Sequence, residues 1–80
     1  MERDAKSVLQ LIGKHSGEWS WYQLARSNAG IELAADGKNL MRIIDGLKMS
    51  RYIEEKAGHN QSQPKYAITE LGREAITSEN

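Results

Sequence analysis

The stretch KYAITELGREAI, residues 65–76, changes from strand-like to helix-like periodicity within a few positions. Its first four residues alternate between polar or small side chains and large apolar ones, which predicts a β-strand over residues 65–68. Thr69 follows, and its hydroxyl can cap the first turn of a helix. The stretch therefore predicts a short strand that leads directly into a helix from Glu70 to about Thr77.

The segment RYIEEK, residues 51–56, predicts the strand that pairs with this one. Tyr52 and Ile53 are residue types that favour strands. The intervening residues 57–64, AGHNQSQP, are polar and include one glycine and the only proline of the chain. We therefore expect an antiparallel β-hairpin with a long polar tip.

Two helices are expected in the first part of the chain. Residues 4–15 carry apolar side chains at the i, i+3, i+4 spacing of one helical face, and Gly17 is well suited to the left-handed conformation that follows a helix. Ser20 and Gln23 have the spacing of a capping box, in which each side chain bonds the backbone at the other residue. This box predicts a second, short helix over residues 21–27.

The third helix has the clearest helical pattern in the chain. We expect Asp36 to be its N-cap and Met49 to lie near its end, with residues 28–36 forming a connector that has room for an extra helical turn. Gly46 lies inside this helix, where glycine costs about 1 kcal/mol relative to alanine, and it predicts a close contact with another helix. The apolar face consists of Leu40, Ile43, Ile44 and Leu47.

The inward faces of these elements predict one hydrophobic core. Trp21, Tyr52 and Tyr66 fall on apolar faces and are expected to pack there, whereas Tyr22 is expected to be exposed and Trp19 to lie either against the second helix or on the surface. The aliphatic residues expected in the core are Leu9, Ile12, Leu24, Leu40, Ile44, Leu47, Ile53, Ile68 and Leu71, and Ile76 is expected to turn inward with Leu71.

Length and composition limit the class of protein. Eighty residues with 39% hydrophobic composition suit one domain, residues 1–80, with one compact core. The chain has no cysteine, which excludes disulfides, thiolate catalysis and cysteine-ligated zinc. No apolar run approaches the ~20 residues of a membrane-spanning helix, and the amphipathic N-terminal segment does not read as a secretory signal. We therefore expect a cytoplasmic protein that does not contact a membrane.

The charges are balanced overall but unevenly distributed. The formal net charge is zero, with 11 basic and 11 acidic residues. Residues 38–65 hold six basic and three acidic residues, a net charge of +3, and the segments on either side are negative. This bias favours an anionic partner only if the fold gathers those residues on one surface.

Two segments carry a resemblance to a known family. LKMSRYI, residues 47–53, and YAITELG, residues 66–72, resemble the winged-helix domains of prokaryotic transcription regulators. Arg51 stands where such domains often have glycine. The resemblance implies a small α+β fold with a three-helix core, a C-terminal β-hairpin wing and a short final helix. It also implies binding of double-stranded DNA, with the third helix in the major groove and the wing on the backbone or minor groove.

The exposed face of the third helix supplies the first candidate contacts. Arg42 could pair with guanine and Asn39 with adenine, while Lys38 could meet a phosphate and Lys48 lies on the same face. The alternative is that these residues are the solvated side of an amphipathic helix, with Arg42 and Asp45 forming an i, i+3 pair.

The wing supplies the second set of candidate contacts. His59, Asn60, Gln61 and Lys65 lie at its tip or base, where Asn, Gln and Lys side chains suit phosphates or the minor groove. The alternative is a loop that is polar for solubility.

Other functional classes have less support in the sequence. The two histidines lie on different elements without an acidic cluster, and no glycine-rich phosphate loop is present, so we expect no catalytic residue, metal or cofactor. The rival interpretation is a winged helix that binds a protein partner or a second copy of itself, because a fold does not determine a function.

Overall fold

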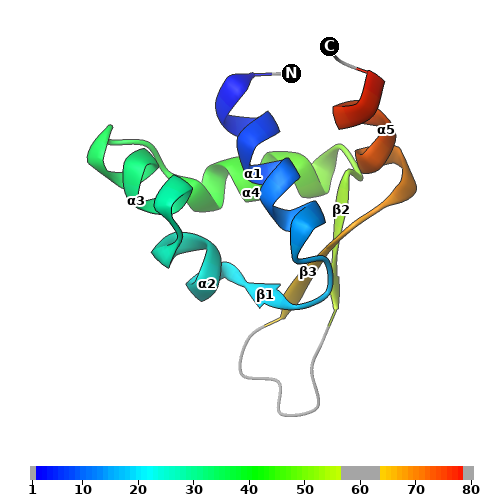
Figure 1. The fold of residues 1–80 in the computed structure, drawn as a ribbon, viewed down its shortest axis with the longest axis horizontal. Helices are drawn as coiled ribbons and strands as arrows, with labels where there is room; N and C mark the ends of the chain where they lie inside the picture. The colour runs from blue at the N-terminus through cyan, green and yellow to red at the C-terminus, as the bar shows by residue number, and fades with distance from the viewer. Residues whose placement is uncertain (1, 57–63, 79–80) are drawn as a thin grey trace.

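The computed structural model describes residues 2–56 and 64–78. Within these residues the chain forms five helices and a three-stranded antiparallel sheet, an α+β fold as expected. The elements, in chain order, are α1 (Arg3–Lys14), β1 (Trp19–Ser20), α2 (Trp21–Arg26), α3 (Asn28–Ala35), α4 (Leu40–Met49), β2 (Ile53–Lys56), β3 (Lys65–Ile68) and α5 (Glu70–Ser78) (Figure 1).

The predicted hairpin is present and is completed by a strand that the sequence did not reveal. β3 is the central strand: it pairs with β2 in the register Ile53↔Ile68, and with the two-residue β1 through Trp19↔Tyr66. The β2–β3 hairpin lies at one end of α4, and α1 crosses α4 in Figure 1. The predicted wing residues His59, Asn60 and Gln61 lie outside the described residues.

Thr69 and Gly72 explain why the last strand leads straight into a helix. The Thr69 hydroxyl oxygen accepts the Gly72 N–H at 3.0 Å, as predicted for an N-cap, and the Thr69 N–H donates to the Tyr52 carbonyl at 2.9 Å. A Cβ atom on Gly72 would lie 2.2 Å from that same carbonyl oxygen. The start of α5 is therefore pressed against the backbone that enters β2, and only glycine fits at the contact.

The turn between α4 and β2 is a Schellman motif with an unusual residue. The N–H of Tyr52 donates to the carbonyl of Leu47 at 3.0 Å, and that of Arg51 to the carbonyl of Lys48 at 2.9 Å. Arg51 has φ +65°, the left-handed conformation that glycine adopts most easily. This geometry gives the physical reason why glycine suits that position.

Two predictions for the middle of the chain were wrong. Residues 28–36 are not a connector with an extra turn, because α3 spans most of them as a regular helix. Asp36 does not cap α4: it ends α3, where Gly37 takes φ +76° and the Lys38 N–H donates to the Leu33 carbonyl at 2.9 Å. The N-cap of α4 is Asn39, whose side chain accepts the Arg42 N–H.

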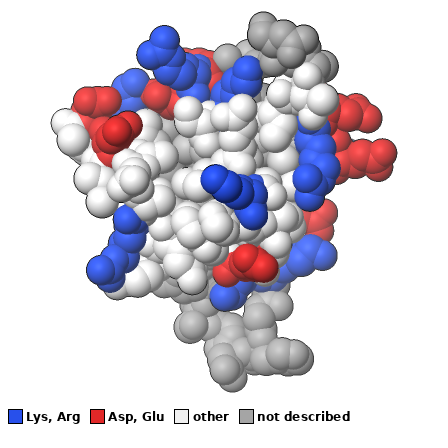
Figure 2. Space-filling view, in the orientation of Figure 1, with Lys and Arg blue, Asp and Glu red and all other residues white. Residues whose placement is uncertain are grey.

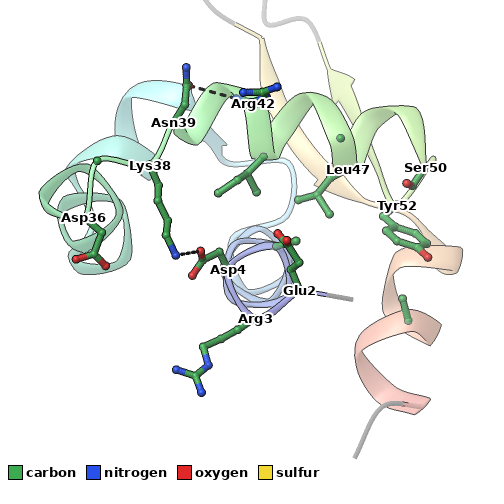
Figure 3. A pocket seen from close by; sticks show the side chains of 15 residues that line it. Glu2, Arg3, Asp4, Asp36, Lys38, Asn39, Arg42, Leu47, Ser50 and Tyr52 are labelled. Atoms are coloured by element: carbon green, nitrogen blue, oxygen red, sulfur yellow. Dashed lines mark hydrogen bonds and ion pairs between the residues drawn. The ribbon is translucent and has the colours of Figure 1, made fainter.

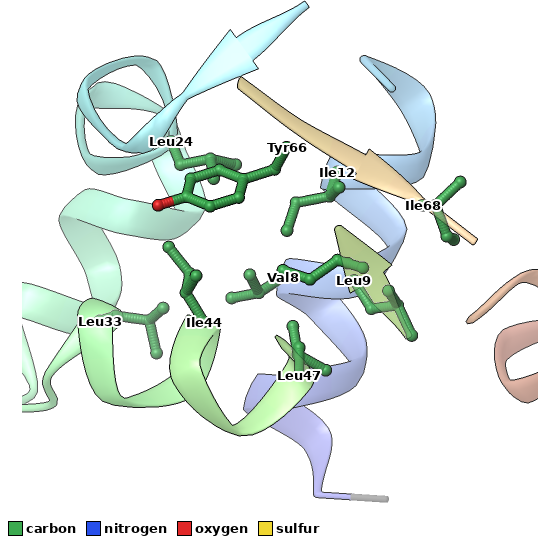
Figure 4. Packing of buried hydrophobic residues seen from close by; sticks show 10 residues of the cluster. Val8, Leu9, Ile12, Leu24, Leu33, Ile44, Leu47, Tyr66 and Ile68 are labelled. Atoms are coloured by element: carbon green, nitrogen blue, oxygen red, sulfur yellow. The ribbon is translucent and has the colours of Figure 1, made fainter. Parts of the chain in front are cut away.

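The core confirms most of the predicted residues. One cluster of buried side chains joins α1, α2, α3, α4 and the sheet (Figure 4). Leu40 packs against this cluster while partly exposed, and Tyr52, Trp19 and Ile76 do the same. The buried members are Val8, Leu9, Ile12, Leu24, Leu33, Ile44, Leu47, Ile53, Tyr66 and Ile68.

Two residues expected in the core are exposed. Leu71 is 47% exposed because the contact at Gly72 turns Gly72, Ala75 and Ile76 inward and leaves Leu71 on the outer side of α5. Trp21 is 38% exposed: the buried residue of α2 is Leu24. Tyr22 is half exposed, as predicted.

Candidate nucleic-acid interface

The solvent-facing side of α4 carries the residues that the sequence placed there. Ile44 and Leu47 are buried, so the opposite side of the helix presents Arg42, Asp45 and Met49 to solvent. Arg42 is exposed and its guanidinium makes no ion pair or hydrogen bond within the described part of the chain. The alternative pair with Asp45 does not form, which leaves this cation available to a ligand.

The side-chain oxygen of Asn39 already forms a hydrogen bond with the first turn of α4. Its Oδ1 accepts the backbone N–H of Arg42 at 3.3 Å, the usual N-cap interaction (Figure 3). The bidentate contact with adenine expected from the sequence needs both the oxygen and the NH2 group of the amide. Only the NH2 group is free of this cap, so adenine recognition by Asn39 competes with the start of α4.

Lys38 lies just before α4 and points toward α1. Its Nζ is 2.5 Å from Oδ2 of Asp4, an ion pair between side chains that are 48% and 26% exposed. The hydrogen bond with Asp4, and after it the charge of Asp4, raise the pKa of Lys38 above its usual value. A phosphate must therefore compete with Asp4 for this ammonium group.

Lys48, near the end of α4, is also paired. Its Nζ donates to Oε2 of Glu55 on β2 at 2.9 Å, and this hydrogen bond raises the pKa of Lys48. The pair joins the last turn of α4 to the hairpin. It also neutralises a cation that the sequence assigned to DNA.

Lys65 lies at the base of the hairpin. It faces Lys56 across the β2–β3 ladder, and its Nζ donates to the backbone carbonyl of Glu18 at 3.1 Å. This contact leaves the charge of Lys65 without a carboxylate partner in the described part of the chain. Of the four predicted cations, Arg42 and Lys65 are thus the two that keep an uncompensated charge.

Gly46 does not have the role that its sequence position predicts. A Cβ atom added there would meet nothing within 4 Å among the described residues, so none of the other helices described contacts it closely. Gly46 instead borders an open hollow between α1, α4 and α5, whose edge carries the Asp4–Lys38 pair (Figure 3).

Met49 is the exposed residue that the sequence analysis did not single out. Its side chain is 86% exposed, the largest value among the large hydrophobic residues that the structure describes. The signal was present in the sequence, because Met49 is seven positions after Arg42 and residues at i and i+7 share a helical face.

The face of the molecule drawn in Figure 2 shows no single dominant charge. On this face basic and acidic side chains are interspersed along the edges, and one basic side chain lies near the middle of an otherwise largely uncharged area. Among residues 2–56 and 64–78, no group of three or more His, Cys, Asp or Glu side chains is placed to hold a metal ion. No helix in this part of the chain is both long and apolar enough to cross a membrane.

Comparisons with protein-family models, with curated proteins and with solved structures found no match to this chain.

Proposed function

We propose that this chain is a winged-helix domain that binds double-stranded DNA, as a small transcription regulator. In this proposal α4 enters the major groove and the β2–β3 hairpin, as the wing, contacts the backbone or the minor groove. The observation that carries the proposal is Arg42, an exposed arginine whose guanidinium has no partner among the described residues, on the helix that directly precedes the hairpin. Arginine on such a helix is the commonest reader of guanine in the major groove.

The connection between α4 and the hairpin supports a single composite surface. The Schellman motif fixes the exit from α4, and the Lys48–Glu55 pair ties the last turn of the helix to β2. On the other side of the hairpin, Thr69 holds the start of α5 against Tyr52. A helix and hairpin held together in this way can contact adjacent parts of one duplex.

The second candidate function is docking of a protein partner, and the same surface supplies the observation that favours it. Two of the lysines assigned to DNA are neutralised by Asp4 and Glu55, while Met41 and Met49 expose apolar side chains on α4. A partner protein with an apolar patch suits such a helix better than a polyanion does.

Salt dependence separates the two functions. A fluorescence anisotropy titration against a mixed-sequence duplex at two salt concentrations should show binding that weakens steeply as salt rises, because phosphate contacts release counterions. Absence of binding to the duplex at low salt would refute the DNA proposal and favour the protein partner.

Three variants test which residues make the contacts. Arg42→Ala should weaken binding by about 1–3 kcal/mol and relax preference at one base position, whereas Lys65→Ala should weaken all sequences equally and reduce the salt slope by about 1. Lys14→Ala, on the exposed side of α1, is the control that should leave affinity unchanged. Circular dichroism must show all three variants folded. If Lys14→Ala alone lowers affinity, α4 is not the recognition helix.

A further inference from the structure

Contacts within the described structure do not account for the residue types at three positions on one face of α4. Arg42, Gly46 and Met49 are spaced i, i+4 and i+7, so they project from the same side of the helix. Among the described residues, the Arg42 guanidinium has no partner, a Cβ atom on Gly46 would meet nothing within 4 Å, and the Met49 side chain is 86% exposed.

Gly46 differs from Gly30 and Gly72, two helical glycines at which the structure has no space for a side chain. A Cβ atom on Gly30 or Gly72 would lie 2.2 Å from a backbone carbonyl oxygen, so each of those glycines allows a close internal contact. Gly46 allows no internal contact, although glycine is among the least favourable residues inside a helix. A glycine also permits close approach of a backbone to a ligand, and here Gly46 is exposed at the open hollow that Arg42 also lines.

Met49 lies one turn further along the same face. Its apolar side chain is 86% exposed, next in line after Arg42 and Gly46. In the major groove the C5-methyl group of thymine is the apolar feature that distinguishes bases, and side chains read it by direct contact. The long, adaptable thioether of methionine suits such a contact.

We infer that, in the proposed DNA complex, α4 approaches the bases most closely at Gly46 and Met49 contacts the methyl group of a thymine. This inference rests on the proposed function and adds the base chemistry that the helix reads. The seven residue-to-residue steps from Arg42 to Met49 span about 10 Å along the helix axis. For a helix lying along the groove, this length corresponds to about three base pairs at ~3.4 Å each. The thymine therefore lies about three base pairs from the guanine that Arg42 contacts.

The test of Gly46 combines stability with affinity. Gly46→Ala should raise the melting temperature of the free protein by about 4–8 °C, because the added methyl group meets open space and improves helix propensity. The same variant should bind the selected duplex described below at least tenfold more weakly. A more stable variant with unchanged DNA affinity would overturn the close approach at Gly46.

The test of Met49 removes single methyl groups from the DNA. Duplexes are first selected from a random pool by the unmodified protein, and each thymine of the selected duplex is then replaced in turn by uracil. We expect one replacement, about three base pairs from the position affected by Arg42→Ala, to weaken binding several-fold. Met49→Ala should lose the same affinity for the thymine duplex and show no further loss on the uracil duplex.

Met41→Ala is the matched control, because Met41 is a partly exposed methionine of α4 outside the i, i+4, i+7 line. This variant should keep the sensitivity to uracil. If the protein binds DNA but no uracil replacement matters, if Met49→Ala keeps the sensitivity, or if no sequence is selected, the inference falls and the proposed function stands. If the protein binds no duplex at low salt, both fall.

Discussion

Gly72→Ala tests the contact that joins the last strand to the last helix. The added Cβ atom would lie 2.2 Å from the Tyr52 carbonyl oxygen and 2.8 Å from Cγ1 of Ile68, whereas real Cβ contacts essentially never fall below 3.0 Å. The Tyr52 oxygen must therefore move by at least 0.8 Å relative to α5. Because this oxygen belongs to the backbone, no side-chain rotation can relieve the clash.

The cost follows from what such a movement breaks. The Thr69 N–H donates to the Tyr52 carbonyl at 2.9 Å, a bond that contributes about 0.5–1.5 kcal/mol net. The single proton of the Thr69 hydroxyl is shared between the carbonyls of Arg51 at 2.7 Å and Tyr52 at 3.0 Å. Overpacking against Ile68 adds about 1–3 kcal/mol. We expect Gly72→Ala to lower the free energy of unfolding by about 1.5–4.5 kcal/mol, measured by urea denaturation monitored by circular dichroism.

Gly46→Ala is the control for this measurement, since it adds the same methyl group to a helix where nothing lies within 4 Å. It should raise the free energy of unfolding by about 1 kcal/mol. A Gly72→Ala variant within 0.5 kcal/mol of the unmodified protein would show that α5 does not rest on the backbone at Tyr52.

Three further predictions concern single groups. Arg51→Gly should raise the free energy of unfolding by up to about 1 kcal/mol in urea denaturation, because the strain of the left-handed φ that glycine relieves exceeds the freedom that glycine adds to the unfolded chain. Arg51→Val increases that strain and should lower the free energy of unfolding by about 1–2 kcal/mol. Asp4→Asn should strengthen duplex binding at low salt and steepen the salt slope by about 0.9, because it releases Lys38 for a phosphate; an unchanged slope would show that Lys38 reaches none. Burial, and after it the charge of Glu55, raise the pKa of Tyr66 above the usual 10.0, so the folded state holds this proton more tightly than the unfolded state. The stability from this group is complete below pH 10 and is lost as the pH rises through the folded pKa, a decline that unfolding measurements should not show in Tyr66→Phe.

The local chemistry of turns and caps made the second half of the fold predictable. The strand over residues 65–68 and the Thr69 cap are present as expected, although Ala67 is buried together with Tyr66 and Ile68. The hairpin register follows because Ile53 and Ile68 must face the same core.

The predictions were wrong where contacts between residues far apart in the sequence decide between two structures that fit the local sequence equally well. Asp36-Gly37 fits the start of one helix as well as the end of another, and the packing of Leu33 in the core makes it an end. β1 has only two residues and exists because β3 pairs with it, so the sequence has no alternating pattern long enough to predict this strand. Leu71 was expected in the core, but the contact at Gly72 sets the rotation of α5 and leaves Leu71 exposed.

The candidate interface was predictable as a set of exposed side chains but not as a charged surface. Arg42 and Met49 follow from helical spacing alone. The partner of Lys38, by contrast, is 34 residues away on α1, and that of Lys48 is on the following strand. No local pattern shows that these two ammonium groups are neutralised.

The position of β3 in the middle of the sheet sets an order for folding. β3 is synthesised after both of its neighbours, so neither β1 nor β2 has a strand to pair with until residues 65–68 have emerged. In the folded protein the Ile68 N–H donates to the Ser16 hydroxyl, 52 residues earlier in the chain, and Tyr66 lies in the core with residues of α1, α2, α3 and α4. Such long-range closure is slow compared with helix formation. A chain that stops before Lys65 therefore lacks the central strand, and both of its pairings wait for residues 65–68.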